Sequence, residues 1–216
     1  ADMFTTDLDR AKDICDLIIK RGLKISWKLD CGIRIDSVEP ELYKKLKAAG
    51  CYGVGYGLES GSQKILDKIH KGLNIKEAHN AIKWANEAGI ETVGFFMFGL
   101  PGETVETMEE TIKLATQLKL DYAKVTLATP FPGTALYAEL QAKGRIKSQE
   151  WSAYNFHTPS KVYDHDNLDW DVMQEYYEKF YKKYYFRPSY LIRRLVRDIK
   201  TGNLFSDMYY AFKTFI

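Results

Sequence analysis

Two kinds of hydrophobic spacing alternate along the first two thirds of the chain. Segments with apolar residues three or four positions apart predict helices, and segments in which every second residue is apolar predict strands. The predicted helices span residues 7–21, 40–49, 61–69, 75–88, 103–119 and 133–143, and the predicted strands span 24–30, 52–58, 91–98 and 122–128. Strands that alternate with helices are typical of a parallel sheet with right-handed crossovers. The sequence therefore predicts an α/β fold.

Three of the four predicted strands carry glycine or polar residues on one face, which a parallel sheet covered by helices on both sides would not. These faces comprise Ser26, Lys28 and Asp30; Gly53, Gly55, Gly57 and Glu59; and Lys124 and Thr126. The opposite faces, which include Ile25 and Tyr52, are apolar. Apolar faces that meet helices and polar faces that line a lumen indicate a partial, open TIM-like (β/α) barrel with parallel strands, because four strands do not close one. A doubly wound sheet with one solvent-exposed edge is the alternative.

The character of the sequence changes in its last third. Residues 145–168 are polar and irregular, and from about residue 169 aromatic residues are interleaved with Lys and Arg. Breaks near Pro188 and Gly202 divide this tail into two or three helices. We therefore expect a barrel over residues 1–144, a connector over 145–168 and a C-terminal helical tail over 169–216.

Composition excludes several classes of function. The 31 Lys and Arg against 29 Asp and Glu give a net charge of +2, which offers no global argument for nucleic acid or an anionic membrane. The longest apolar run, Val93 to Leu100, is too short to span a bilayer. The acidic N-terminus does not resemble a signal peptide, and three cysteines do not make a disulfide scaffold. These features predict a cytoplasmic protein without a membrane span.

Three loops that follow predicted strands are the candidates for chemistry. They are GYGLESGSQKIL (55–66), GFFMFGLPGET (94–104) and TPFPGT (129–134). The carboxyl ends of parallel strands share one rim, where a carboxylate such as Glu59 meets a ligand. Each loop also has a purely structural interpretation, as a helix cap or a rigid turn. The glycine spacing of 94–104 matches neither a dinucleotide fingerprint nor a nucleoside triphosphate loop.

Cysteine and histidine side chains give no metal motif. The three cysteines lack CxxC-type spacing, which argues against zinc or a self-contained cluster. His157 and His165 are candidate ligands or bases, although surface histidines are commoner.

Taken in order, the motifs resemble the radical SAM superfamily, and within it the branch of Fe–S oxidoreductases that often carries an upstream cobalamin-binding domain. The resemblance covers most of the chain, and the order and spacing of its segments make it specific. The segments are DMFTTD, CGIRID, AAGCYGVGYGLESGSQKIL, KIHKGLNIKEA, GIETVGFFMFGLPGET, LATPFPGTALY and FYKKYYFRPSYLIRRL.

This resemblance implies a radical mechanism. A [4Fe–4S] cluster donates an electron to S-adenosylmethionine, and the resulting 5′-deoxyadenosyl radical abstracts a hydrogen atom from a small-molecule substrate. In the family a CxxxCxxC motif holds the cluster, and this sequence has none. The family's order places that motif upstream of Ala1. We therefore expect the S-adenosylmethionine-binding part of a longer enzyme, inactive on its own, with any cobalamin bound outside this chain.

The resemblance also implies roles for single residues, all at one rim. Glu59 matches a polar position that faces the ribose or amino end of the cofactor, and Lys71 matches a basic position that pairs with its carboxylate. The backbone around Phe98, Gly99 and Leu100 matches the strand end that cradles adenine. Thr129 and Pro130 match the next wall of that pocket, and Arg34 faces either the cofactor or the substrate.

Two other interpretations stay open at this point. The basic, aromatic residues 176–200 are able to stack bases and pair phosphates, although helical spacing of the tyrosines also predicts a packed face. A truncated α/β domain would instead act through self-association, because an open sheet edge is costly to leave bare. Such a homodimer would form through the sheet edge or through the aromatic tail.

Overall fold

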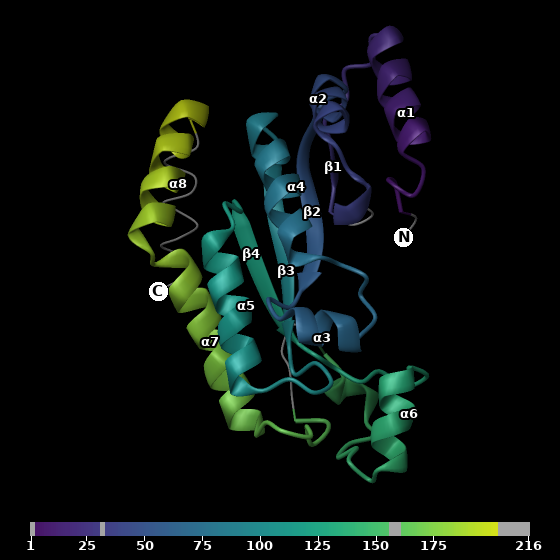
Figure 1. Ribbon diagram of the computed structural model, residues 1–216, viewed down its shortest axis with the longest axis vertical. Coiled ribbons are helices and arrows are strands. Elements are labelled where there is room, and N and C mark those ends of the chain that lie inside the picture. Colours follow the sequence, from purple (N-terminus) through teal and green to yellow (C-terminus); the bar gives the residue numbers. More distant parts are fainter. Residues whose placement is uncertain (1–2, 31–32, 156–160, 203–216) are drawn as a thin grey trace.

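The computed structural model describes residues 3–30, 33–155 and 161–202, and its centre is an open sheet of four parallel strands (Figure 1). The strands are β1 (Trp27–Leu29), β2 (Cys51–Glu59), β3 (Glu91–Phe98) and β4 (Tyr122–Leu127), and they lie in the order β1-β2-β3-β4. A doubly wound sheet reverses its strand order at a switch point, whereas a barrel adds each strand beside the previous one. The prediction of a partial, open barrel is confirmed.

Helices connect successive strands, as the crossovers of parallel neighbours require. These connecting helices are α2 (Pro40–Ala48), α3 (Gln63–Lys68), α4 (Ile75–Glu87) and α5 (Val105–Gln117). Helix α1 (Leu8–Lys20) precedes β1, and α6 (Ala135–Ala142) follows β4. With one exception, the predicted bounds of strands and helices in this region agree with the structure to within two residues, which is the usual uncertainty of element ends.

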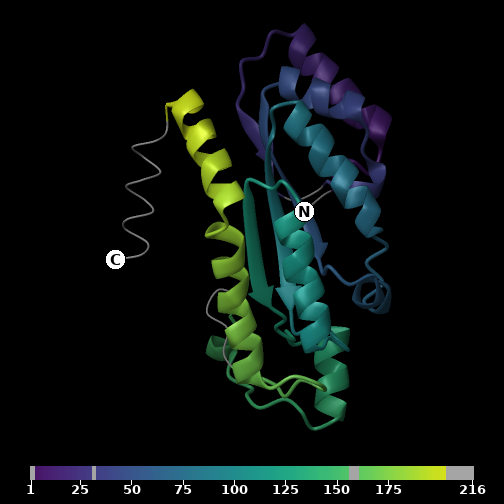
Figure 2. The same ribbon diagram turned by 60° about the vertical axis from the view of Figure 1, so that its left-hand side comes forward.

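The two faces of the sheet differ, as the alternation in sequence predicts. Along β3 the side chains of Thr92, Phe96 and Phe98 are buried, and the intervening Val93 and Phe95 are half-buried. Helices α4 and α5 lie on the same side of the sheet, over the buried face (Figure 2). In the described part of the chain this half-buried, concave face carries no helix (Figures 1 and 2), which leaves room for a ligand.

Two predicted positions on the apolar face are wrong. Ile25 and Tyr52 are each 44% exposed, and the strand expected over 24–30 is reduced to Trp27–Leu29. The pairing of β1 with β2 passes from Trp27↔Cys51 to Lys28↔Gly53, so Tyr52 has no partner on β1. An extra residue of this kind bulges out of the ladder and turns its side chain away from the regular face.

The C-terminal tail seals the β4 edge of the sheet. It forms α7 (Trp170–Tyr185) and α8 (Pro188–Thr201), two helices divided near Pro188 as predicted. The Tyr181 hydroxyl accepts a hydrogen bond from the Val125 N–H (3.3 Å) and donates one to its carbonyl (3.1 Å). Tyr185 does the same for Ala123, at 3.2 and 2.9 Å. Four residues along a helix advance about 6 Å and two along a strand about 6.7 Å, so the two tyrosines match alternate residues of β4.

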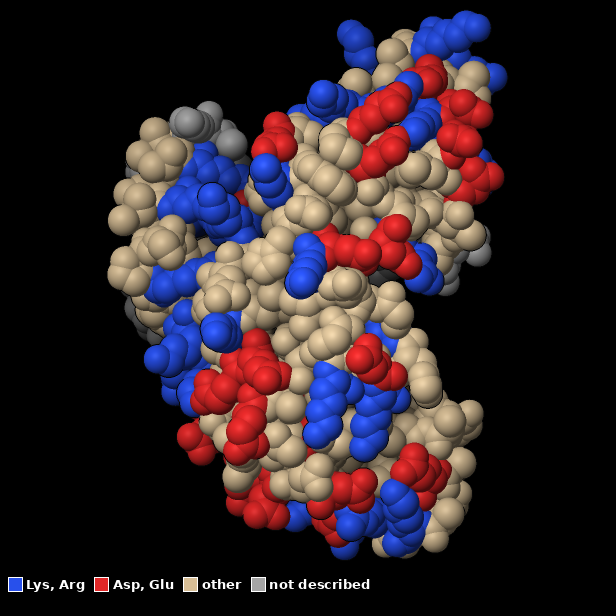
Figure 3. All heavy atoms as spheres, in the orientation of Figure 1, with Lys and Arg blue, Asp and Glu red and all other residues tan. Residues whose placement is uncertain are grey.

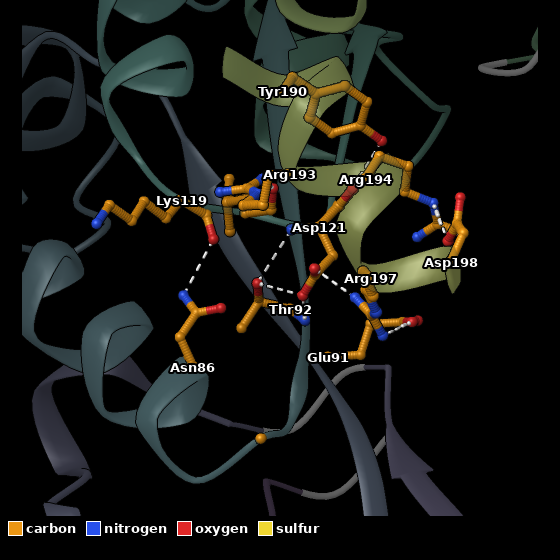
Figure 4. A network of polar contacts seen from close by, with 12 residues as sticks. Asn86, Glu91, Thr92, Lys119, Asp121, Tyr190, Arg193, Arg194, Arg197 and Asp198 are labelled. Carbon is orange, nitrogen blue, oxygen red and sulfur yellow. Dashed lines mark hydrogen bonds and ion pairs between the residues drawn. The ribbon is translucent and has the colours of Figure 1, made fainter. Parts of the chain in front are cut away.

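Arginines of α8 bind this helix to the amino-terminal ends of β3 and β4 (Figure 4). Arg197 bridges Glu91 and Asp121, and Arg193 donates to the Leu120 carbonyl. The apolar side chains on the outer side of α8 are exposed, among them Leu191, Ile192, Leu195, Val196 and Ile199. The aromatic and basic residues that motivated the nucleic-acid interpretation thus make structural contacts with the sheet.

The contacts of α7 bear on the prediction of self-association through an open sheet edge. Since α7 covers β4, self-association through an open sheet edge now concerns β1, which pairs only with β2 among the described residues, and it stays a prediction. Within the described ranges, no helix is both long enough and apolar enough to cross a membrane.

Candidate functional site

A cavity of about 490 Å³ opens on the concave face, beside the carboxyl ends of β1 and β2. This volume lies within the range of roughly 300–1,000 Å³ that small-molecule pockets occupy. Its charged lining residues are Asp30, Arg34, Asp36, Glu59 and Lys71, and its apolar ones include Ile33, Leu73 and Phe95. The cavity therefore combines a small apolar surface with charges of both signs.

Glycines of β2 form the floor of this cavity, where a side chain would meet neighbouring atoms. A Cβ atom on Gly55 would lie 2.4 Å from the Asp30 carbonyl oxygen and 2.9 Å from the Phe95 ring. A Cβ atom on Gly57 would lie 2.9 Å from Glu59 Oε1 and 3.1 Å from Lys71 Nζ. The bare backbone at Gly57 thus gives the two charged side chains their place.

Glu59 ends β2 in a strained conformation. Its φ angle is +59°, in the left-handed region that residues other than glycine seldom adopt. The Ser60 N–H donates to the Leu58 carbonyl at 2.7 Å and closes a three-residue turn around Glu59. The pairing with β3 skips a residue here, from Gly57↔Phe95 to Glu59↔Phe96. Strain of this kind is concentrated at functional sites.

Lys71 reaches the same place from the end of α3. It lies between His70 (φ +54°) and Gly72 (φ +65°), and its backbone N–H donates to the Leu66 carbonyl at 2.9 Å. Its Nζ atom donates to Glu59 Oε1 at 2.7 Å, with the two side chains 34% and 22% exposed. Half-buried ion pairs are screened less by salt than fully exposed ones. The cavity therefore presents an anion and a cation side by side.

A second ion pair lines the cavity beyond β1. The Arg34 guanidinium donates to both carboxylate oxygens of Asp36, at 2.9 and 2.5 Å. This hydrogen bonding lowers the pKa of the Asp36 carboxyl below its ordinary value. The Arg34 backbone N–H donates to Thr5 Oγ1 at 2.9 Å, which ties the segment to the start of the chain.

The other five predicted site residues do not line this cavity, although they follow the carboxyl ends of β3 and β4 at the same rim. They are Phe98, Gly99, Leu100, Thr129 and Pro130. The Phe98 ring is buried on the helix side of the sheet, against Phe180. Thr129 is half-buried and Pro130 is buried. The structure thus brings together Arg34, Glu59 and Lys71 around the cavity. The predicted residues at the ends of β3 and β4 lie outside its lining.

Backbone groups of the Gly99–Leu100 turn are engaged within the protein. Both N–H groups donate to Glu103 Oε2, at 2.5 and 3.2 Å. The Gly99 carbonyl accepts from the Tyr163 hydroxyl at 3.1 Å, and the Leu100 carbonyl lies 3.0 Å from His165 Nε2. The turn therefore has no free N–H donors for a ligand, while each carbonyl oxygen keeps a second lone pair.

Glu103 is a buried acid that sequence reasoning missed. Its side chain is fully buried, and burial raises the pKa of its carboxyl to about 8 despite the two backbone donors. Its Oε1 atom has no hydrogen-bond partner among the described residues. Burial, and secondarily the nearby Glu103, raise the pKa of the Tyr163 hydroxyl as well. The feature of the sequence that could have indicated its burial is an acidic residue directly after an apolar strand and turn.

Histidines and cysteines give no candidate metal centre in the described part of the chain. His165 Nδ1 accepts hydrogen bonds from the Asn167 and Leu168 N–H groups, so its Nε2–H faces the Leu100 carbonyl and the ring serves the turn. His157 lies outside the described residues. No group of three or more His, Cys, Asp or Glu in the described ranges is arranged to hold a metal ion.

The two cysteines that the structure describes, Cys15 and Cys51, are free and buried. Burial raises the pKa of the Cys15 thiol to about 11 and that of Cys51 above its ordinary value. The thiolate is the form that binds metals, so neither residue fits a cluster ligand.

Charged side chains of both signs line the cavity. Figure 3 shows Lys and Arg gathered along the margin formed by α8 and α7, with acidic and basic side chains mixed elsewhere on this face. A cavity with adjacent, internally neutralised charges is suited to a small ligand that itself carries both signs, because each end of such a ligand finds an opposite charge.

Comparison with known proteins identifies a family and relatives for this chain. Residues 4–115 match the model of the radical SAM superfamily. A curated protein of Pyrococcus horikoshii, described as an uncharacterized methyltransferase, is 35% identical over 192 residues, which cover 89% of this chain and 41% of that protein. An anaerobic magnesium-protoporphyrin IX monomethyl ester cyclase of Cereibacter sphaeroides is 32% identical over 204 residues, covering 88% and 33%. The chain thus spans less than half the length of these two relatives.

A solved structure shares the fold. The radical S-adenosylmethionine methyltransferase TsrM of Kitasatospora setae, solved with cobalamin and a [4Fe–4S] cluster bound, superposes with a TM-score of 0.58 at 24% sequence identity. The matched region covers 65% of this chain and 27% of that chain.

Proposed function

Because the chain belongs to the radical SAM superfamily, we propose that its cavity is part of the S-adenosylmethionine site of a radical SAM iron–sulfur enzyme. The observation that carries this proposal is the Glu59–Lys71 pair, whose charged groups lie 2.7 Å apart beside Gly57 in the cavity lining. S-adenosylmethionine offers a carboxylate, an ammonium group and ribose hydroxyls. A lone cation or a lone acid would complement only part of that set.

In this proposal each member of the pair has its own partner on the ligand. The Lys71 ammonium pairs with the ligand carboxylate in a charge-assisted hydrogen bond. The Glu59 carboxylate accepts from the ribose hydroxyls or from the ligand ammonium. Arg34, which also lines the cavity, faces either the same ligand or the substrate. The Glu59–Lys71 ion pair holds both side chains beside the cavity, so little ordering of them is left to binding.

The loops at the ends of β3 and β4 supply the remaining wall in this proposal. The backbone of Phe98, Gly99 and Leu100 and the Thr129–Pro130 turn lie at the rim where adenine would be held. Since the Gly99 and Leu100 N–H groups are taken by Glu103, recognition there would use carbonyl oxygens and apolar contact.

The two cysteines that the structure describes do not fit a [4Fe–4S] cluster. The sequence lacks a CxxxCxxC motif, and Cys15 and Cys51 are buried. We therefore propose that this chain contributes the cofactor pocket and that other residues of a longer enzyme hold the cluster and any cobalamin. In such an enzyme the bound cluster and S-adenosylmethionine supply radical chemistry on a small molecule. The relatives, named as a methyltransferase and a cyclase, support radical chemistry without specifying the substrate.

The test is titration of the 216-residue chain with S-adenosylmethionine, followed by calorimetry. We expect Lys71→Met to weaken binding roughly 10- to 100-fold, the loss typical of a hydrogen bond between charged groups. Lys64→Met removes an exposed lysine of α3 and serves as the matched control. The same titrations with 5′-methylthioadenosine, which lacks the amino-acid end, should show no difference between Lys71→Met and the wild type. Absence of binding to the wild type would overturn the proposal, and an equal loss for both ligands would overturn the role of Lys71.

A further inference from the structure

The strained turn at Glu59 needs support that the residue itself does not provide. A three-residue turn with positive φ is rare, and such a conformation persists only where the surrounding structure over-determines it. Glu59 is half-buried at the cavity, and among the described residues its carboxylate accepts its hydrogen bond from the end of the long Lys71 side chain. The support must therefore come from the residues that follow it.

Thr111, in the middle of α5, provides one such support. Its Oγ1 atom accepts a hydrogen bond from the Gly61 N–H at 2.9 Å and donates one to the Thr107 carbonyl at 3.0 Å. It also lies 3.3 Å from Ser60 Oγ. Because the Thr111 proton is directed to Thr107, the Ser60 hydroxyl is the donor in that contact. All three hydrogen-bonding capacities of the threonine hydroxyl are then used.

Ser60 continues the same network along the turn. Its hydroxyl accepts from the Ser62 N–H at 3.1 Å. Ser60 and Thr111 are both fully buried, so water does not replace a partner that is lost. Gly61, which lies between Ser60 and Ser62, packs closely against α5, since a Cβ there would lie 2.4 Å from the Glu110 carbonyl oxygen. The segment after Glu59 is thus held against α5 by two hydrogen bonds to Thr111 and by the close packing of Gly61.

Neither Thr111 nor Ser60 lines the cavity. We propose that Thr111, acting through Ser60 and Gly61, is a positioning residue that holds Glu59 in its strained turn and directs the carboxylate toward the ligand. The proposal rests on the proposed function, in which Glu59 contacts S-adenosylmethionine. It goes beyond that function because the conformation of Glu59 would then depend on a residue of α5 that does not line the cavity.

Titration with S-adenosylmethionine of three variants tests the ligand-dependent part. Thr111→Val keeps the shape of the side chain and removes the acceptor, whereas Thr111→Ser keeps the hydroxyl. Thr92→Val is the matched control, because Thr92 is equally buried and its hydroxyl contacts Asp121 near the opposite ends of the strands. We expect Thr111→Val to bind roughly 10-fold more weakly, the factor that an unsatisfied buried donor produces. Thr111→Ser and Thr92→Val should bind within about twofold of the wild type.

A measurement without ligand separates the two proposals. The three-bond coupling between the amide and α protons of Glu59 reports its φ angle by nuclear magnetic resonance. We expect it to change in Thr111→Val and in the second variant, Ser60→Ala, and to stay unchanged in Thr111→Ser and Thr92→Val. Unchanged Glu59 coupling in both Thr111→Val and Ser60→Ala overturns the inference. If the wild type binds no S-adenosylmethionine, the proposed function fails, and the coupling alone decides the role of Thr111.

Discussion

Replacing Glu103 with glutamine should remove a loss of stability that this protein undergoes as the pH rises from acid to mildly basic values. Glu103 is fully buried under the Gly99–Leu100 turn, and burial raises the pKa of its carboxyl from 4.5 to about 8. Between these two values the folded protein holds a proton that the unfolded chain releases. Raising the pH therefore favours the unfolded state, and the stability present at acid pH is lost as pH rises toward the folded pKa.

The magnitude follows from the size of the shift. A pKa change from 4.5 to about 8 implies that the free energy of unfolding falls by about 3 kcal/mol between pH of about 5.5 and about 8.5. Glutamine keeps an oxygen that accepts from the Gly99 and Leu100 N–H groups and carries no charge at any pH. Glu103→Gln should therefore resemble the wild type near pH of about 5.5 and be more stable than it near about 8.5.

Urea unfolding at these two pH values measures the difference. Glu106→Gln is the control, because Glu106 is an exposed carboxylate in the first turn of α5 and hydrogen bonding from Thr104 lowers rather than raises the pKa of its carboxyl. That control should keep the wild-type loss of stability with pH. If Glu103→Gln shows the same loss between the two pH values as the wild type, the reasoning about the buried proton is refuted.

Two further predictions concern the cavity floor and the sealed edge of the sheet. Gly57→Ala places a Cβ 2.9 Å and 3.1 Å from the ends of the two ion-paired side chains above it, so we expect roughly tenfold weaker binding of S-adenosylmethionine in calorimetry. The flexible side chains yield easily, so stability in urea should change by less than about 1 kcal/mol, and unchanged affinity would contradict the assignment of the floor. Tyr181→Phe leaves the N–H and carbonyl of buried Val125 without their partner and should cost about 2 kcal/mol in urea unfolding. Tyr52→Phe, on an exposed ring, should cost less than about 0.5 kcal/mol, and equal effects of both tyrosine changes would argue against the edge seal.

Much of the architecture was predictable from local pattern. The alternation of glycine with apolar residues from 53 to 58 set the two faces of β2, because side chains on a strand point to opposite sides with a period of two. The same periodicity indicated an open concave face and Glu59 at its rim. At Tyr52 the alternation in the sequence is regular, and the predicted side of the sheet was still wrong. The bulge that turns Tyr52 outward depends on how β1 pairs with β2, which no local pattern contains.

The geometry of the site was decided by contacts between distant parts of the chain. Sequence alone marked Glu59 and Lys71 as candidates, and it did not show that they would pair with each other above Gly57. The role of Thr111 arises only because α5 packs on the turn after β2, some fifty positions earlier in the chain.

Burial is the clearest case of what the sequence did not determine. In the sequence Glu103 looks like an ordinary acid at the start of a helix, and its pKa is raised by burial in the fold. Tyr163 and Asn167 of the connector, some sixty positions later, bond to the Gly99 and Glu103 carbonyls. The tyrosines of α7 were recognisable as a helical face, whereas their match to the free edge of β4 depends on where the tail packs. Periodicity specifies which side of an element is buried. What lies against that side is settled by the free energy of the whole fold, and the chemistry of the site depends on that contact.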